Sequence, residues 1–289
     1  MEKIVLGTVQ MGLNYGINNS SGKVSIKESH QILLKAFNSN IRTLDTAEVY
    51  GNAHKIIGDF HKKNDTCKFE IITKFPHDIE INRIEDKVLD YLDVLDVKCI
   101  EVLMFHSFES FKNNLHAIDL LNQLKLKGYI NHIGVSVYTN HHMEYLVNEN
   151  SITVVQLPFN LLDNISVRGN LIQKLKDKGK IIHTRSAFLQ GLFFKNTNDK
   201  NKTVKKLYSE LEILKQVVSE SQCSMEELAL SYCIQQDNID NVIIGVDSID
   251  QLKSNIEASF YVVRDDVIQI INKIKVKDLN LLNPSLWQS

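Results

Sequence analysis

Short apolar runs alternate with longer amphipathic segments along almost the whole chain. We predict the apolar runs to be strands, at residues 4–7, 41–45, 69–74, 100–106, 132–136, 153–156, 180–185 and 241–245. Most of them are hydrophobic throughout, which is typical of strands that are covered on both faces. Strands that alternate in this way with helices predict parallel β/α units.

The segments between the strands carry helix signals. Three of them begin with the capping-box pattern, a serine three residues before Glu or Gln, at Ser25, Ser224 and Ser248. Apolar residues recur at helical spacing across 111–126. Gly128 and Gly179 follow lysine-rich segments, so we expect each to end a helix.

The later part of the chain departs from this alternation. Residues 194–204 are long and polar, and we expect a loop without regular structure there. Residues 264–275 predict a final amphipathic helix, and the following residues a tail that folds back over the rest. The C-terminal helix and tail together cover about 262–289.

Eight β/α units fit either a doubly wound open sheet or a closed barrel. An open sheet that binds a dinucleotide should carry GxGxxG after its first strand, whereas residues 6–12 read LGTVQMG. We therefore predict an α/β fold, a (β/α)8 TIM barrel, forming a single domain over residues 1–289.

The predicted strands share polar or glycine residues at their carboxyl ends: Asp45, Lys74, His106, Ser136, Gln156, Arg185 and Gly245. In a (β/α)8 barrel these ends converge at one mouth, where active sites are built. One polar strand end is ordinarily a helix cap or a solvated terminus. Seven such ends of varied chemistry favour a functional site.

Three of these strand ends, with Tyr50 in the loop after Asp45, could together transfer a proton. Tyrosine has an ordinary pKa of about 10, and a nearby lysine ammonium would lower the pKa of Tyr50 toward neutrality. An aspartate such as Asp45 would keep a buried Lys74 charged, and His106 could orient a carbonyl or share in the proton transfer. The alternative is a structural Asp45–Lys74 ion pair, with Tyr50 and His106 as packed neighbours.

Composition narrows the classes of partner. A net charge of −2 and a pI of about 6.6 give no electrostatic signature for nucleic acid or an anionic membrane. The N-terminus lacks the features of a signal peptide, and no apolar run approaches the roughly 18 residues of a membrane span. The four cysteines and ten histidines show no metal-ligand spacing, so we expect no metal, no disulfide and a reducing, cytoplasmic location.

From Val5 to about Ala258 the chain resembles the aldo-keto reductase superfamily. The resemblance rests on the order and spacing of LGT (6–8), LDTAEVYG (44–51), ITK (72–74), LMFHS (103–107), GVS (134–136), VQLPFN (155–160), FLQGL (188–192) and IIGVDSIDQLKSN (243–255).

This resemblance implies an oxidoreductase that uses NAD(P)(H) without a metal, and a catalytic tetrad of Asp45, Tyr50, Lys74 and His106. It implies that the dinucleotide lies extended across the barrel mouth, with the nicotinamide amide near Ser136 and Gln156 and the adenosine end on residues 243–255. The residues it places at the cofactor are Thr8, Ser136, Gln156, Arg185, Gln190, Gly245, Asp247, Gln251 and Asn255.

Two departures from the family pattern concern the reacting end of the cofactor. Val137 stands where many members have an asparagine, so one contact to the nicotinamide amide is missing. Arg185 stands where a tyrosine commonly stacks on the nicotinamide. It could hold an anionic group of the substrate or the cofactor phosphates, or it could pair with a carboxylate of the protein.

A third departure concerns the choice of dinucleotide. Members that prefer NADP(H) usually carry Lys or Arg around the 2′-phosphate, whereas this chain has residues 245–248, GVDS, and Gln251. Asp247 would repel a phosphate and suits a ribose hydroxyl, although Lys253 could compensate. Both NADP(H) and NAD(H) stay open.

The function expected is reduction, or reversible oxidation, of a small polar aldehyde, ketone or sugar-like substrate, with Tyr50 as general acid or base. The alternative is a barrel that binds the nucleotide as a regulatory or subunit protein with little turnover. A metal-dependent hydrolase lacks a ligand cluster. The sequence does not predict the physiological substrate or the oligomeric state.

Overall fold

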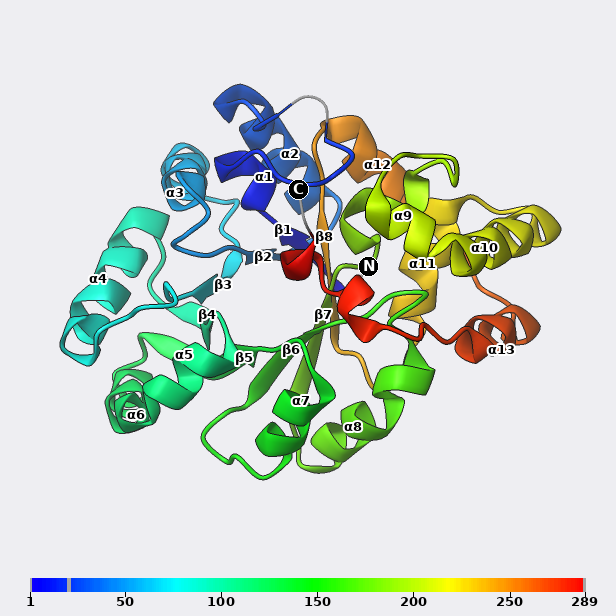
Figure 1. Ribbon diagram of the computed structural model, residues 1–289. Coiled ribbons are helices and arrows are strands. Elements are labelled where there is room, and N and C mark those ends of the chain that lie inside the picture. The colour runs from blue at the N-terminus through cyan, green and yellow to red at the C-terminus, as the bar shows by residue number, and fades with distance from the viewer. Residues whose placement is uncertain (1, 20–21, 288–289) are drawn as a thin grey trace.

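Eight parallel strands close into a barrel in chain order, with helices around the outside (Figure 1). This computed structural model describes residues 2–19 and 22–287. The strands are β1 (Ile4–Gly7), β2 (Thr43–Asp45), β3 (Glu70–Lys74), β4 (Ile100–Phe105), β5 (Ile130–Ser136), β6 (Val154–Pro158), β7 (Ile181–Arg185) and β8 (Asn241–Gly245). Strand β1 pairs with both β2 and β8, which closes the barrel and confirms the predicted (β/α)8 fold.

Most of the helices lie in the connections between strands. They are α1 (Val9–Gly12), α2 (Ile26–Asn38), α3 (Ala53–Lys63), α4 (Ile84–Leu95), α5 (Phe108–Asn113), α6 (Ile118–Leu126), α7 (Asn140–Val147), α8 (Ile165–Asp177), α9 (Lys202–Lys206), α10 (Tyr208–Ser221), α11 (Met225–Ile234), α12 (Ile249–Ala258) and α13 (Asp265–Lys273). Among residues 2–19 and 22–287, none of the helices combines the length and apolar character needed to cross a bilayer.

Side chains alternate between two apolar layers because successive residues of a strand point to opposite faces. Within β1, Val5 faces the barrel interior, while Ile4 and Leu6 face the helices. The interior layer is made of Val5, Ile72, Val102, Met104, Val154 and Ile243. This layer fills the barrel, so polar groups at the strand ends stand on an apolar floor.

The predicted capping boxes form to different degrees. Ser224 accepts a hydrogen bond from the Glu227 amide, and Glu227 accepts one from the Ser224 amide, which completes the box. Ser25 and Ser248 cap their helices. At the start of α12, however, the Gln251 side chain accepts from the backbone amide of Asp247 rather than of Ser248.

Two local predictions are wrong. The polar stretch 194–204 is not a loop throughout, because Asn201 accepts hydrogen bonds from two backbone amides and starts helix α9. The apolar stripe over 111–126 does not form one helix. It is divided into α5, a 3₁₀ turn (Leu115–Ala117) and α6, and Leu115 is 39% exposed.

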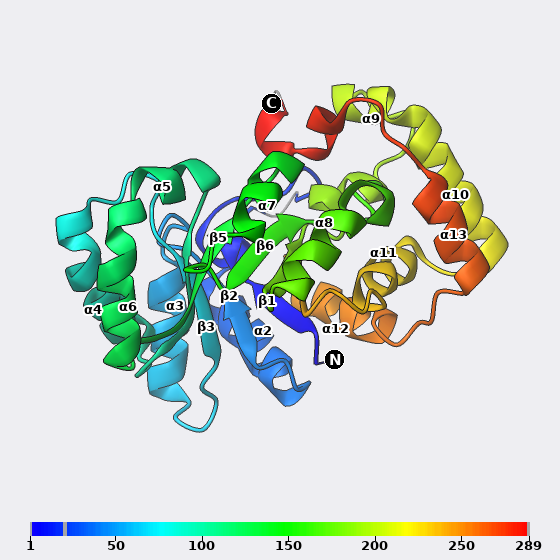
Figure 2. The same ribbon diagram turned by 90° about the horizontal axis from the view of Figure 1, so that it is seen from below.

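The C-terminal tail folds over one end of the barrel, as the sequence predicts (Figure 2). After α13 the chain makes two 3₁₀ turns, Leu279–Leu282 and Pro284–Leu286. Figure 2 places them at the top, at the opposite end from the N-terminus. The tail therefore covers the end of the barrel at which the strands finish.

Candidate functional site

A cavity of about 930 Å³ opens at the carboxyl ends of the strands. Six of the seven predicted strand-end residues line it, and Lys74 lies buried beneath them. All nine residues that the resemblance places at the cofactor also line it: Thr8, Ser136, Gln156, Arg185, Gln190, Gly245, Asp247, Gln251 and Asn255. The cavity thus extends from Tyr50 and His106 to helix α12, and the tail residues Asn283 and Ser285 add to its wall.

Asp45 and Lys74 form a buried ion pair at the floor of the cavity. The Lys74 Nζ donates to Asp45 Oδ1 at 2.6 Å and to the carbonyl of Thr46 at 3.0 Å. The second oxygen of Asp45 accepts from Gln156 Nε2 at 2.8 Å. Burial lowers the pKa of Lys74, and the neighbouring carboxylate of Asp45 opposes that shift. Gln156 therefore orients Asp45, a contact that the sequence did not predict.

The loop after β2 holds Tyr50 in place through its backbone. The Tyr50 amide donates to the carbonyl of Ala47 at 3.0 Å. A Cβ at Gly12 would lie 1.7 Å from the carbonyl oxygen of Tyr50, and Gly51 adopts a φ of +57°. Only glycine fits such a close approach or prefers such a φ, so these two glycines fix the loop that carries the phenol.

The predicted lowering of the Tyr50 pKa is wrong. Burial raises the pKa of Tyr50, the charge of Asp45 raises it further, and Arg185 acts in the opposite sense. The Lys74 Nζ lies 5.4 Å from the centre of the Tyr50 ring, but Asp45 already neutralises its charge. The phenol therefore stays protonated at neutral pH.

His106 meets Tyr50 edge to face, with ring centres 5.8 Å apart. Its other neighbour is His77, whose ring stacks at 4.8 Å and 16°. Burial, followed by the charge of Lys74, lowers the pKa of His106 to about 3, so its imidazole is neutral at physiological pH. His77 belongs to the loop after β3, and no strand-end pattern marked it in the sequence.

Arg185 extends across the cavity toward the end of β5. Its guanidinium carbon lies 4.0 Å from the centre of the Tyr138 ring, and Nη2 donates to the carbonyl of Val137 at 3.2 Å. It forms no ion pair with a carboxylate in the described part of the chain. The interpretation of Arg185 as half of an internal ion pair is therefore wrong.

The far end of the cavity is bounded by β8, α12 and the loop between β1 and α2. Asn19 Nδ2 donates to Asp247 Oδ1 at 3.1 Å, and Gln190 Nε2 donates to the hydroxyl of Tyr15 at 2.7 Å. The sequence did not predict that Tyr15 and Asn19 line the site, because their loop carries no motif. Lys253 pairs with Asp250 at the surface and does not reach the cavity.

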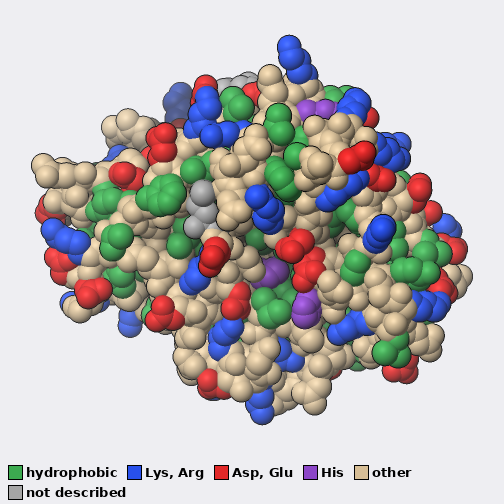
Figure 3. Space-filling view, turned by 180° about the vertical axis from the view of Figure 1, so that it is seen from behind, with side chains coloured by type: hydrophobic (Ala, Val, Ile, Leu, Met, Phe, Trp, Pro, Cys, Tyr) green, Lys and Arg blue, Asp and Glu red, His purple; other side chains and the backbone are tan. Residues whose placement is uncertain are grey.

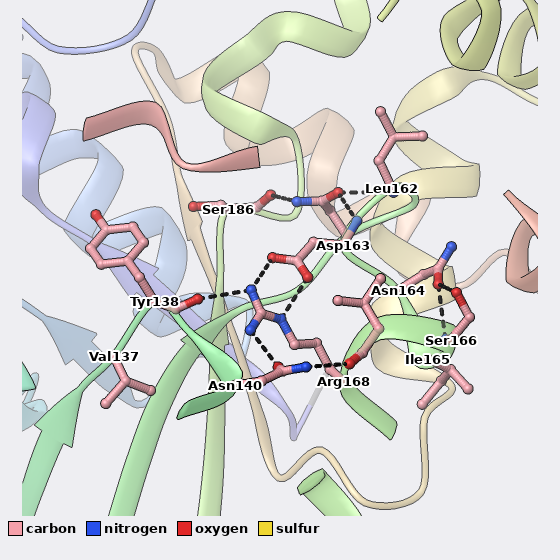
Figure 4. Close-up of polar contacts among 12 residues, drawn as sticks. Val137, Tyr138, Asn140, Leu162, Asp163, Asn164, Ile165, Ser166, Arg168 and Ser186 are labelled. Carbon is pink, nitrogen blue, oxygen red and sulfur yellow. Dashed lines mark hydrogen bonds and ion pairs between the residues drawn. The ribbon is translucent and has the colours of Figure 1, made fainter. Parts of the chain in front are cut away.

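A buried network supports the loop after β5 (Figure 4). Arg168, on helix α8, donates to both oxygens of Asp163 at 2.6 and 2.8 Å. The same guanidinium donates to the carbonyl of Tyr138 at 2.8 Å and to Asn140 Oδ1 at 2.7 Å. Nothing in the sequence pattern marked Asp163 and Arg168 as a pair.

A smaller cavity, of about 320 Å³, lies at the end where the strands begin. Figure 3 shows this face, on which acidic and histidine side chains lie near the centre. Glu70, Glu101 and His132 line the cavity, and His183 is buried within it. No group of three or more His, Cys, Asp or Glu within 2–19 and 22–287 is placed to hold a metal ion.

Similarity to known proteins extends over most of the chain. The model of the aldo/keto reductase family matches residues 3–276. An NADH-specific methylglyoxal reductase of Escherichia coli (strain K12) is 23% identical over 305 residues, covering 89% of this chain and 93% of the relative. An uncharacterized oxidoreductase, YqkF of Bacillus subtilis (strain 168), is 24% identical over 295 residues, covering 90% and 91%.

Solved structures share the fold. The aldo-keto reductase AKR11C1 from Bacillus halodurans, in its holo form, superimposes with a TM-score of 0.77 at 19% identity, covering 95% of this chain and 92% of the other. The glycerol dehydrogenase AKR11B4 from Gluconobacter oxydans gives a TM-score of 0.72 at 18% identity, covering 94% and 90%. Because the family model spans nearly the whole chain, this protein belongs to the aldo/keto reductase family.

Proposed function

We propose that the protein is an NAD(P)(H)-dependent oxidoreductase that reduces, or reversibly oxidises, a small polar aldehyde, ketone or sugar-like substrate. The observation that carries the proposal is the buried Asp45–Lys74 pair beneath a cavity that Tyr50 and His106 line. To protonate a carbonyl, the site needs a proton-donating side chain beside the carbonyl oxygen and charged groups that support the donor.

The cavity residues fit an extended dinucleotide. Gln10 Oε1 is buried and has no hydrogen-bond partner among the described residues, and Ser136 and Asn255 offer further polar groups along the cavity. When bound, the cofactor would supply a hydride, and thus two electrons, to the carbonyl carbon and would become NAD(P)⁺. Ser136 and Gln156 are proposed to hold its nicotinamide end and Asp247, Gln251 and Asn255 its adenosine end.

The chain's own residues would provide the proton. Because its pKa is raised, the Tyr50 hydroxyl carries the proton that the carbonyl oxygen receives, and in the reverse direction Tyr50 would accept it. The neutral imidazole of His106 would direct the carbonyl oxygen toward that hydroxyl. Lys74, 5.4 Å from the centre of the Tyr50 ring, would offset part of the negative charge that Asp45 places beside Tyr50 as the proton leaves.

We propose NAD(H) as the preferred cofactor. A 2′-phosphate beside Asp247 would meet a carboxylate, whereas a ribose hydroxyl could donate to it. Arg185 is the one lysine or arginine among the described residues that line the cavity, and it contacts Tyr138 rather than α12. The Escherichia coli relative is NADH-specific by name, which agrees with this choice.

The experiment is a titration of NADH and NADPH against the protein, followed by a carbonyl panel with the tighter ligand. We expect Tyr50→Phe to lower kcat by about 10²- to 10⁴-fold, the range of general acid catalysis, and to leave the Kd for the cofactor unchanged. Tyr145→Phe is the matched control, because the Tyr145 hydroxyl accepts from Lys112 outside the cavity. Cofactor binding without turnover of any carbonyl compound would instead favour a regulatory barrel.

A further inference from the structure

Arg185 places a positive charge inside the cavity, and among the described residues no carboxylate forms an ion pair with it. Its guanidinium has one hydrogen bond, to the carbonyl of Val137, and a stacking contact with Tyr138. A guanidinium carries five N–H donors, so most of its donors remain available in the cavity. Neutral substrates would make little use of such a group.

The backbone at Arg185 is held from the neighbouring strand. The Phe159 amide donates to the carbonyl of Arg185 at 3.0 Å, and Asn160 Nδ2 donates to the carbonyl of Ser186 at 3.2 Å. Ser186 has a φ of +65°, a conformation that non-glycine residues rarely adopt and that often marks functional positions. The strand end that carries Arg185 is therefore fixed before any ligand binds.

The surface on which Arg185 stacks is fixed as well. Arg168 donates to the carbonyl of Tyr138 and is itself held by both oxygens of Asp163 (Figure 4). Arg168 and Asp163 are almost fully buried, at 5% and 0% exposure. The backbone beneath this platform of stacked ring and guanidinium is thus held in place, which reduces the entropy lost when a ligand is bound.

This platform lies within electrostatic reach of the proposed proton donor. The charge of Arg185 acts on Tyr50, Lys74 and His106, and in each case it disfavours positive charge or favours negative charge. Arg185, Tyr50 and His106 line one cavity, so an anionic group at Arg185 and a carbonyl at Tyr50 would share that space. A small molecule with both groups could occupy both positions.

We propose that Arg185 binds a carboxylate of the substrate, so that the preferred substrates are oxo acids or sugar acids whose carbonyl lies at Tyr50. A planar guanidinium matches the planar carboxylate with paired hydrogen bonds. A single guanidinium balances a monoanion better than a phosphate dianion, and the described cavity lining contains no second lysine or arginine. This inference rests on the proposed function and narrows its substrate class.

The test compares matched substrates in steady-state kinetics with NADH. One pair is 4-oxobutanoate and its methyl ester, another is D-glucuronate and D-glucose, and a third is D-glyceraldehyde 3-phosphate and D-glyceraldehyde. We expect kcat/KM to favour the carboxylate of each acid pair by about 10- to 100-fold, the range of charge-assisted hydrogen bonds, mainly through KM. In Arg185→Gln this preference should fall to about 2-fold or less.

Controls separate the outcomes. Arg264→Ala removes an exposed arginine that pairs with Asp266 on α13, and it should keep the full preference. The inference is overturned if the wild type shows no preference for carboxylates, if it prefers the phosphate, or if Arg185→Gln keeps the preference. It is also overturned if that variant weakens NADH binding alone, since Arg185 would then serve the cofactor.

Failure of the proposed function would look different. In that case no carbonyl compound of any charge would be reduced. Calorimetry of 4-oxobutanoate against the protein with NADH present would still decide the inference, which requires binding that Arg185→Gln weakens by about 10-fold or more. Undetectable binding to the wild type would overturn it.

Discussion

Replacing Asp45 by asparagine removes the charged partner of a buried lysine. In the wild type, Asp45 accepts from Lys74 through one oxygen and from Gln156 through the other. Asparagine has the same shape but only one acceptor oxygen, so its amide nitrogen would face a donor on one side. We therefore expect Asp45→Asn to leave Lys74 as a buried charge without compensation.

The magnitude follows from the burial of the pair. The side chains of Lys74 and Asp45 are 1% and 6% exposed, so water cannot replace the lost partner. Removing one member of a buried ion pair typically costs about 3–5 kcal/mol. Thr46 still offers a carbonyl to Lys74, which places the expected loss in the free energy of unfolding at about 3 kcal/mol.

The loss should depend on pH in a definite direction. Burial already lowers the pKa of Lys74 below its unfolded value, and removal of Asp45 lowers it further. The unfolded chain then binds more protons than the folded chain up to the unfolded pKa of about 10.4. The loss in the free energy of unfolding that Asp45→Asn causes, relative to the wild type, should therefore become smaller as the pH rises from 7 to 9.5.

The assay is urea unfolding followed by circular dichroism at both pH values, in wild type and variant. Asp59→Asn is the matched control, because Asp59 pairs with Lys63 at 2.8 Å but both side chains are exposed, and it should cost about 0.5 kcal/mol or less. Equal losses in the two variants, or a loss in Asp45→Asn that does not change with pH, would refute the reasoning.

Three further predictions concern the loop at Tyr50, the cofactor and acid stability. Gly12→Ala should displace the Tyr50 backbone and lower kcat by at least about 10-fold. Steady-state rates measure this effect, and circular dichroism checks that the variant is folded. An unchanged kcat would contradict the prediction. Asp247→Asn should lower the ratio of the Kd for NADPH to the Kd for NADH by about 10-fold, as measured by fluorescence titration. An unchanged ratio would show that Asp247 does not determine which cofactor is preferred. Burial lowers the pKa of His54 and of His183 to about 4, below the unfolded value near 6.5, so the free energy of unfolding should fall as the pH drops from 6.5 to 4. In urea unfolding of His54→Gln, the slope of that free energy against pH should correspond to about one proton fewer taken up on unfolding.

The sequence predicts the parts of the molecule that follow from short-range patterns. Strands β1 and β8 have the predicted bounds, because a charged residue precedes each of them and a glycine ends each apolar run. Asp45 and Lys74 were predicted to meet because adjacent parallel strands bring their carboxyl ends together.

Contacts between residues far apart in the sequence could not be predicted in this way. Gln156 reaches Asp45 across 111 residues of sequence, and the Arg168 contact to Tyr138 depends on how α8 packs beside the end of β5. The sign of the Tyr50 pKa shift was missed because proximity to Lys74 was considered without the burial of the phenol or the neutralisation by Asp45. These effects depend on three-dimensional distances that no local pattern contains.

The site combines two kinds of support, and this affects how its specificity could be engineered. The charge pair Asp45–Lys74, proposed to support proton transfer by Tyr50, stands on strand ends above a packed interior. Asn283 and Ser285, in contrast, line the cavity from the tail. A variant library confined to Asn283 and Ser285 would alter the cavity wall without touching the residues that hold the proton. Variants of this protein that accept other substrates could therefore be selected while the residues that carry out the reaction stay the same.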